Sequence, residues 1–193
     1  MGRFMNHKKW VVVLALIATA LILTHLPVSE ADAAASASDF LIEGSTLTKY
    51  RGTDERVTIP DTVEVVGESA FENNQKVQLV VVPKSVKRMD AYVFWGCDNL
   101  EEVVLGKGLT SVDEYAFSGC TGLKQITIPE NVQSIDAQAF AGCTNLTDIY
   151  IPDTVTSIAD DAFLNCDNVT IHADEGSVAE KFAQKLAEQK SQS

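Results

Sequence analysis

Apolar residues recur along this chain at intervals of 23 positions, in several registers that keep step with one another. The two clearest registers hold phenylalanine and cysteine, namely Phe71, Phe94, Phe117, Phe140, Phe163, Cys97, Cys120, Cys143 and Cys166. Coincident registers of this kind indicate an internal repeat, and a repeat of this length is typical of a solenoid. The pattern therefore predicts five stacked coils over residues 57–171, with the phenylalanines and cysteines forming inward-facing ladders.

Within one unit, alternating apolar and polar residues predict a short strand. Ile126 and Ile128 flank the polar Thr127, which is the pattern of a strand with one buried face. Pro129 has no N–H group and therefore ends the strand, and a second extended segment and a turn around Phe140 complete the unit. A single coil cannot bury its apolar side alone. The coils are therefore expected to stack at the usual strand spacing of ~4.8 Å and to form a parallel sheet.

The segments on either side of the repeats predict caps. Two short apolar runs, 40–42 and 47–50, flank Gly44 and predict a hairpin before the first coil. After the last coil, Ser177 and Glu180 form a capping-box pattern at the start of a helix. The expected apolar face of that helix contains Val178, Phe182 and Leu186, with Ala179 and Ala183 beside them. We divide this part of the chain into a linker with hairpin cap, the solenoid, and a capping helix with its tail, at residues 34–56, 57–171 and 172–193.

The first 33 residues show the order of features of a secretory signal peptide. Three basic residues precede an apolar run from Trp10 to Thr24, and small residues at 31–33 offer a cleavage site. The run is 15 residues long, whereas a helix that spans a membrane needs roughly 20. We therefore predict a signal peptide in residues 1–33 and a secreted or cell-surface location. An uncleaved N-terminal anchor is the alternative, and it is the only membrane attachment that we expect.

The charge of the chain restricts its partners. The sequence has 27 acidic and 15 basic residues, a formal net charge of −12. Residues 1–33 contain three basic and two acidic residues, so the remainder carries 12 basic and 25 acidic residues, a net charge of −13. Binding to nucleic acid requires basic residues that neutralise phosphates. We therefore expect no nucleic-acid partner and a well-solvated exterior.

The cysteines occur once per coil, which predicts a ladder of parallel, inward-facing side chains. A disulfide requires converging Cβ atoms and a dihedral angle near ±90°, and zinc requires a tetrahedral set of ligands. A linear ladder supplies neither arrangement. We therefore interpret the cysteines as buried structural thiols and expect no metal and no cofactor. Disulfide-linked pairs such as Cys97–Cys120 remain the alternative.

The sequence shows few motifs of catalytic residues. His172 is the one histidine that follows residue 33, and no Ser-His-Asp or Cys-His arrangement can be assembled around it from the visible motifs. The chain also has no GxxxxGK[ST] phosphate loop. A pair of catalytic carboxylates is the open alternative, although solvated acidic residues are far commoner. We therefore predict that the protein is not an enzyme.

The repeat pattern resembles a known family. Three runs carry the resemblance to the BspA-type leucine-rich repeats: VTIPDTVEVVGESAF (57–71), ITIPENVQSIDAQAFAGC (126–143) and IYIPDTVTSIADDAFLNC (149–166). The resemblance implies a β-rich α/β leucine-rich-repeat solenoid of bacterial origin with a role in adhesion or protein binding at the cell surface. The chain departs from the family pattern at Gly106, where the other units have proline.

Outward-facing residues of the predicted strands form a candidate contact row. This row contains Val81, Val104, Thr127 and Tyr150, and Trp95 is a further candidate because it occupies a variable position. Tyrosine is enriched at binding hot spots, which makes Tyr150 the best anchor. The sequence therefore predicts an exported module that binds a host, matrix or cell-surface protein. A small secreted module that associates with itself is the alternative.

Overall fold

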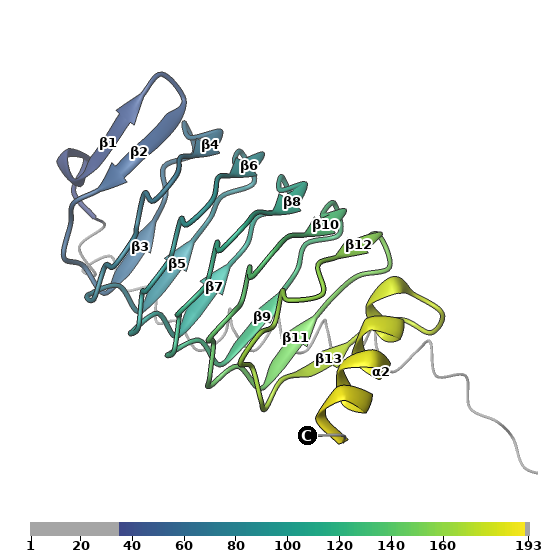
Figure 1. Cartoon of the computed structure of the whole chain (residues 1–193). Helices are drawn as coiled ribbons and strands as arrows, with labels where there is room; N and C mark the ends of the chain where they lie inside the picture. Colours follow the sequence, from purple (N-terminus) through teal and green to yellow (C-terminus); the bar gives the residue numbers. More distant parts are fainter. Residues whose placement is uncertain (1–34, 192–193) are drawn as a thin grey trace, which may run out of the picture. The chain divides into compact units, whose positions relative to one another are not determined.

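The computed structural model describes residues 35–191, which form a solenoid (Figure 1). Each coil contributes one strand to a first face and one strand to a second face. The first face carries three-residue strands: β3 (Arg56–Thr58), β5 (Leu79–Val81), β7 (Glu102–Val104), β9 (Gln125–Thr127), β11 (Asp148–Tyr150) and β13 (Thr170–His172). The second face carries two-residue strands: β4 (Val65–Val66), β6 (Arg88–Met89), β8 (Ser111–Val112), β10 (Ser134–Ile135) and β12 (Ser157–Ile158). The predicted signal peptide lies outside the described residues.

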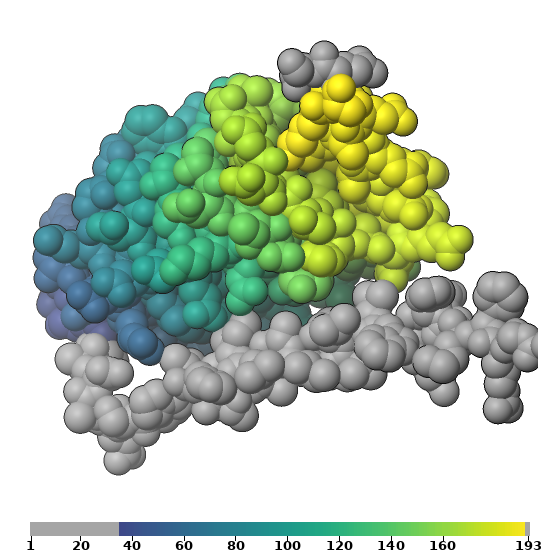
Figure 2. All heavy atoms as spheres, turned by 90° about the horizontal axis from the view of Figure 1, so that it is seen from below, coloured from purple at the N-terminus to yellow at the C-terminus, as the bar shows by residue number. Residues whose placement is uncertain are grey.

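Neighbouring coils pair in parallel. The first face contains the sheets β3-β5-β7 and β9-β11-β13, and the second contains β12-β10-β8 and β1-β2-β4-β6. The register steps by 23 residues between most rungs, so that Val80 pairs with Val103 and Ile135 with Ile158. Figure 2 shows the coils side by side in sequence order. The predicted solenoid with parallel sheets is therefore confirmed.

The N-terminal hairpin is part of the stack. After a short 3₁₀ turn, η1 (Ala37–Asp39), strand β1 (Phe40–Glu43) pairs antiparallel with β2 (Thr46–Tyr50). Gly44 in the turn has a φ of 63°, a conformation that favours glycine. Strand β2 also pairs in parallel with β4, and the Tyr50 ring stacks on Phe71 at 5.0 Å. The cap thus supplies a further rung, and the repeat extends from the five coils expected to six.

The core is a ladder of stacked rings. The centroid of Phe117 lies 5.3 Å from those of Phe94 and Phe140, with interplanar angles of 14° and 3°. All three side chains have no exposed surface. The ladder includes one phenylalanine from each coil: Phe71, Phe94, Phe117, Phe140 and Phe163. Burying a ring of this size is worth roughly 1.5–3 kcal/mol, so each rung of the ladder stabilises the stack appreciably.

The cysteines line the core next to the phenylalanines. Cys97, Cys120, Cys143 and Cys166 are all buried and unoxidised. Each thiol donates a hydrogen bond to the carbonyl of the phenylalanine one coil earlier, as Cys120 Sγ does to Phe94 O at 3.1 Å. The same carbonyl also accepts the N–H of Cys97 at 3.1 Å, so the thiol adds a second bond and finds a partner for its own S–H inside the core.

The C-terminal helix α2 (Val178–Ser191) closes the other end of the stack. Ser177 Oγ accepts a hydrogen bond from the Glu180 N–H at 3.0 Å, which is half of the predicted capping box. The Phe182 ring lies 5.8 Å from Phe163 and covers the end of the ring ladder. Ala179 and Phe182 of the expected apolar face are buried, whereas Val178 is 36% exposed and lies at the edge of that face. Within residues 35–191, no helix combines the length and apolar character that crossing a membrane would require.

Candidate binding surface

Four of the five predicted contact residues form one column across the first face. Val81 lies opposite Val104, and Thr127 lies opposite Tyr150, in the registers of the two sheets. Strand β7 also contacts β9, so the column continues from one sheet to the next. Val104 is 37% exposed although it is apolar. We call this row the sheet column; its members are Thr58, Val81, Val104, Thr127, Tyr150 and His172.

His172 completes the column, which the sequence did not indicate. Its ring stacks on Tyr150 with 4.4 Å between centroids and an interplanar angle of 12°. The last coil is one residue shorter than the others, because Asp148 pairs with Thr170 after 22 positions. Extending the 23-residue period would have placed Ala173 opposite Tyr150. The shortened coil therefore brings an aromatic residue to the position where a small one was expected.

A carboxylate holds the histidine in place. Asp148 Oδ1 lies 2.7 Å from His172 Nε2, and Asp148 belongs to the same strand as Tyr150. The hydrogen bond from His172 lowers the pKa of the Asp148 carboxyl, and a hydrogen bond from the Thr147 side chain adds to this effect. Both members of the pair are partly exposed, at 37% for His172 and 40% for Asp148. Tyr150 and His172 thus form a pre-organised aromatic platform at the C-terminal end of the sheet column.

Trp95 lies away from the sheet column, in the turn that leads from β6 to β7, and is 39% exposed. Its backbone N–H donates to Tyr92 O in the same turn at 3.1 Å. The Tyr92 ring stacks on Tyr115 of the next coil at 4.8 Å and 5°. This tyrosine pair was missed, although the interval of 23 residues between its members is visible in the sequence. The structure therefore separates Trp95 from the other four candidates.

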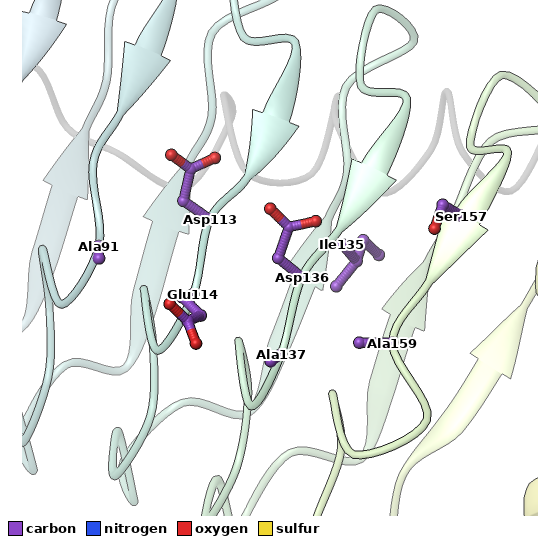
Figure 3. Close-up of a pocket in the computed structure, with 8 residues that line it drawn as sticks. All are labelled: Ala91, Asp113, Glu114, Ile135, Asp136, Ala137, Ser157 and Ala159. Atoms are coloured by element: carbon purple, nitrogen blue, oxygen red, sulfur yellow. The ribbon is translucent and has the colours of Figure 1, made fainter.

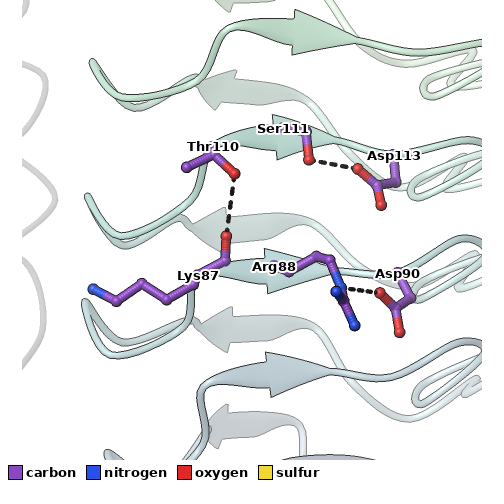
Figure 4. A network of polar contacts seen from close by, with 6 residues as sticks. All are labelled: Lys87, Arg88, Asp90, Thr110, Ser111 and Asp113. Carbon is purple, nitrogen blue, oxygen red and sulfur yellow. Dashed lines mark hydrogen bonds and ion pairs between the residues drawn. The ribbon is translucent and has the colours of Figure 1, made fainter.

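The second face has an acidic depression of about 440 Å³ (Figure 3). Three alanines, Ala91, Ala137 and Ala159, leave room between the acidic side chains around them. The Ser111 hydroxyl donates to Asp113 at 2.6 Å, and Arg88 forms an ion pair with Asp90 at 2.6 Å (Figure 4). Burial raises the pKa of Asp113, and the neighbouring Asp136 and Asp90 raise it further. The depression presents unneutralised carboxylates, and such a surface attracts cationic groups.

The Cys97 and Cys120 thiols are poor nucleophiles and poor ligands. Burial raises the pKa of the Cys97 thiol to about 12, and it also raises the pKa of Cys120. Only a thiolate attacks an electrophile or binds a metal efficiently. Within residues 35–191, no three His, Cys, Asp or Glu side chains are grouped so that they could hold a metal ion.

Comparison with known proteins relates the chain to one repeat family. The profile of the BspA type leucine rich repeat region matches residues 49–170 in six copies. A leucine-rich cell-surface protein from Faecalibacterium prausnitzii is 33% identical, with a TM-score of 0.67, over 72% of this chain and 37% of that protein. A leucine-rich repeat protein from T. pallidum is 26% identical, with a TM-score of 0.68, over 72% of this chain and 70% of that protein.

A leucine-rich repeat protein from Bacteroides ovatus is 29% identical, with a TM-score of 0.59, over 67% of this chain and 36% of that protein. The chain thus covers little more than a third of the length of the Faecalibacterium and Bacteroides proteins. No curated protein matches the sequence. The similarity is therefore one of fold and repeat pattern.

Proposed function

Because the chain belongs to the BspA-type leucine-rich-repeat family, we propose that it is a binding module that recognises a protein partner outside the cell or at its surface. Repeat solenoids present extended surfaces and are typically scaffolds for binding rather than catalysis. The Faecalibacterium protein, with 33% identity, is a cell-surface protein. The signal-peptide pattern in residues 1–33 also supports export.

The sheet column is the observation that carries the proposal. It contains an exposed valine and ends in the stacked rings of Tyr150 and His172. Tyrosine is enriched at hot spots because it contributes a large contact area while losing the freedom of only two side-chain torsions. The Asp148 hydrogen bond restricts the His172 ring further. A partner would therefore meet a surface that loses little conformational entropy on binding.

The size and charge of the column favour a protein ligand. Six rungs at ~4.8 Å extend over about 25 Å, which matches the dimension of a standard protein interface. The net charge of −12 disfavours nucleic acid and anionic lipid. These arguments favour a protein as the partner, such as a host, matrix or cell-surface protein.

The proposal is tested by measuring the binding of the purified protein to a panel of host-surface and matrix proteins by biolayer interferometry. Tyr150→Ala and His172→Ala are compared with Trp95→Ala, which removes a larger exposed ring away from the column. We expect Tyr150→Ala to raise Kd about 30-fold, the equivalent of a hot spot of ~2 kcal/mol, and Trp95→Ala to leave Kd within twofold. The proposal fails if both column variants bind as the wild type does. Concentration-dependent dimers in sedimentation, without any binding to the panel, would favour the self-associating module instead.

A further inference from the structure

The corners that link the strands of the first face to those of the second carry a reversal of charge. Equivalent positions in five consecutive corners are occupied by Asp61, Lys84, Lys107, Glu130 and Asp153. The second and third corners are thus basic, whereas the first, fourth and fifth are acidic. In a chain with a net charge of −12, this is a localised exception to the surrounding potential.

An open depression of about 540 Å³ lies at these basic corners. It is lined by Asp61, Lys84, Ser85, Lys87, Lys107 and Gly108. The Lys87 side chain extends away from Asp90 and Asp113 of the second face, as Figure 4 shows. Three lysines from two coils, together with Asp61, therefore line one depression.

Glycines bring the third corner close to the second. A Cβ atom at Gly108 would collide with the carbonyl oxygens of Lys84 and Val86, and one at Gly106 would collide with Pro83 O. Side chains at these two positions would push the corners apart. The departure at Gly106 thus has a physical reason, because a side chain there would collide with the corner that carries Lys84.

The lysines are not neutralised by neighbouring acids. Among the residues that the structure describes, neither Lys84 nor Lys87 forms an ion pair with a carboxylate. Lys87 Nζ contacts only the Lys84 carbonyl, at 3.4 Å. Lys107 lies 3.8 Å from Glu130, and the two side chains are 79% and 78% exposed. An exposed pair of this kind contributes little, so the positive charge of the depression is available to a ligand.

A buried hydroxyl without a partner adds to the site. Ser85 Oγ is inaccessible to solvent and has no hydrogen-bond partner within residues 35–191. Equivalent side chains in later corners are paired with the preceding coil: Asn131 donates to Lys107 O at 2.6 Å and Thr154 to Val132 O at 3.1 Å. A buried polar group that lacks such a bond is costly and needs an explanation. Ser85 also lines the depression, and rotation about its Cα–Cβ bond would bring the hydroxyl to a ligand oxygen there.

We propose that this depression binds a single compact oxyanion, namely a sulfate or phosphate group. Lys84, Lys87 and Lys107 supply charge-assisted hydrogen bonds, and Ser85 supplies a hydroxyl donor. Asp61 and Glu130 bound the basic corners on either side, so an extended polyanion would meet carboxylates beyond the third lysine. The site is therefore matched to one anionic group, either a free ion or an ester at the end of a small ligand. The inference is independent of the sheet column.

The site is tested by NMR titration of the purified protein with sodium sulfate, sodium phosphate and glucose 6-phosphate, at constant ionic strength in chloride. We expect saturable shifts confined to residues 83–88 and 106–109. Tighter binding of glucose 6-phosphate than of inorganic phosphate would identify an ester as the preferred source, and the reverse would identify the free ion.

Substitutions distinguish binding at this site from a general electrostatic attraction of anions to the protein surface. Lys84→Gln and Lys107→Gln should each weaken binding about fivefold, which corresponds to one exposed charged contact. Lys181→Gln on α2 removes the same charge elsewhere and should have no effect. Ser85→Ala should weaken binding and raise the Tm of the anion-free protein, because it removes an unpaired buried hydroxyl. Shifts that grow linearly with anion concentration, or an equal loss in Lys181→Gln, would refute the site.

Discussion

Substituting alanine for Phe117, the central ring of the ladder, measures how much the stacked rings contribute to the free energy of unfolding. Phe117 has no exposed surface, and its ring stacks on Phe94 and Phe140 at 5.3 Å on both sides. Phe117→Ala would leave a cavity that neither neighbouring coil can fill without losing its own stack. A buried Phe→Ala substitution costs about 3–5 kcal/mol, a total that includes the two ring contacts at ~0.5–1.5 kcal/mol each.

This loss is large compared with the net stability of about 5–15 kcal/mol that is typical of a domain. For a domain of this size, 1 kcal/mol shifts Tm by ~2–4 °C, so Tm should fall by about 6–20 °C. Urea denaturation followed by circular dichroism measures the free energy of unfolding. Leu164→Ala is the matched control, because Leu164 follows Phe163 in its turn but is 48% exposed, and it should cost less than ~0.5 kcal/mol. If Phe117→Ala cost less than ~1 kcal/mol, or no more than Leu164→Ala, the stacked-ring account of stability would be refuted.

Three further predictions concern the helix cap, the thiols and the His–Asp pair. Ser177→Ala removes the acceptor of the Glu180 N–H and should cost about 1 kcal/mol in thermal unfolding; an unchanged Tm would show that the cap is dispensable. Cys97 should not react with Ellman's reagent at pH 8 until the protein unfolds, and fast labelling of the native protein would contradict its burial. Because burial raises the pKa of Cys97 from its ordinary 9.0 to about 12, its contribution to stability is complete below pH 9 and should be lost as pH rises through that interval, which thermal melts can follow. Asp148→Asn should cost at most ~1 kcal/mol at neutral pH because the pair is partly exposed. Since the pKa of Asp148 is lowered, the difference from wild type should disappear as pH falls below its ordinary 3.8, and a difference that persists at pH 2 would exclude the hydrogen bond to the Asp148 carboxylate as its cause.

The sequence predicts those features that repeat in register. Phe94 and Phe117 occupy the same position of successive coils, so their stacking follows from the period alone. The sixth rung does not follow from it, because Tyr50 precedes Phe71 by 21 residues and belongs to a hairpin strand. His172 was missed as a member of the sheet column for a similar reason, since one residue is absent from the last coil.

The helix illustrates a limit of pattern reading. An interval of four residues connects Val178 and Phe182, but an α-helix has 3.6 residues per turn. The buried face therefore drifts, so that Val178 is 36% exposed while Ala179 beside it is buried against the last coil. The basic depression could not be predicted from the sequence for another reason. The unpaired hydroxyl of Ser85 and the close approach at Gly108 depend on how two coils pack, which no single unit reveals.

The central claim is that the sheet column binds a protein partner, and hydroxyl-radical footprinting of a complex tests it most directly. Tyr150 and Trp95 are both oxidisable, and they lie in different parts of the coil, on strand β11 and in the turn after β6. The account predicts that a bound partner protects Tyr150 and His172 from oxidation and leaves Trp95 and Tyr92 as reactive as in the free protein. Protection of Trp95 with unchanged oxidation of Tyr150 would contradict it.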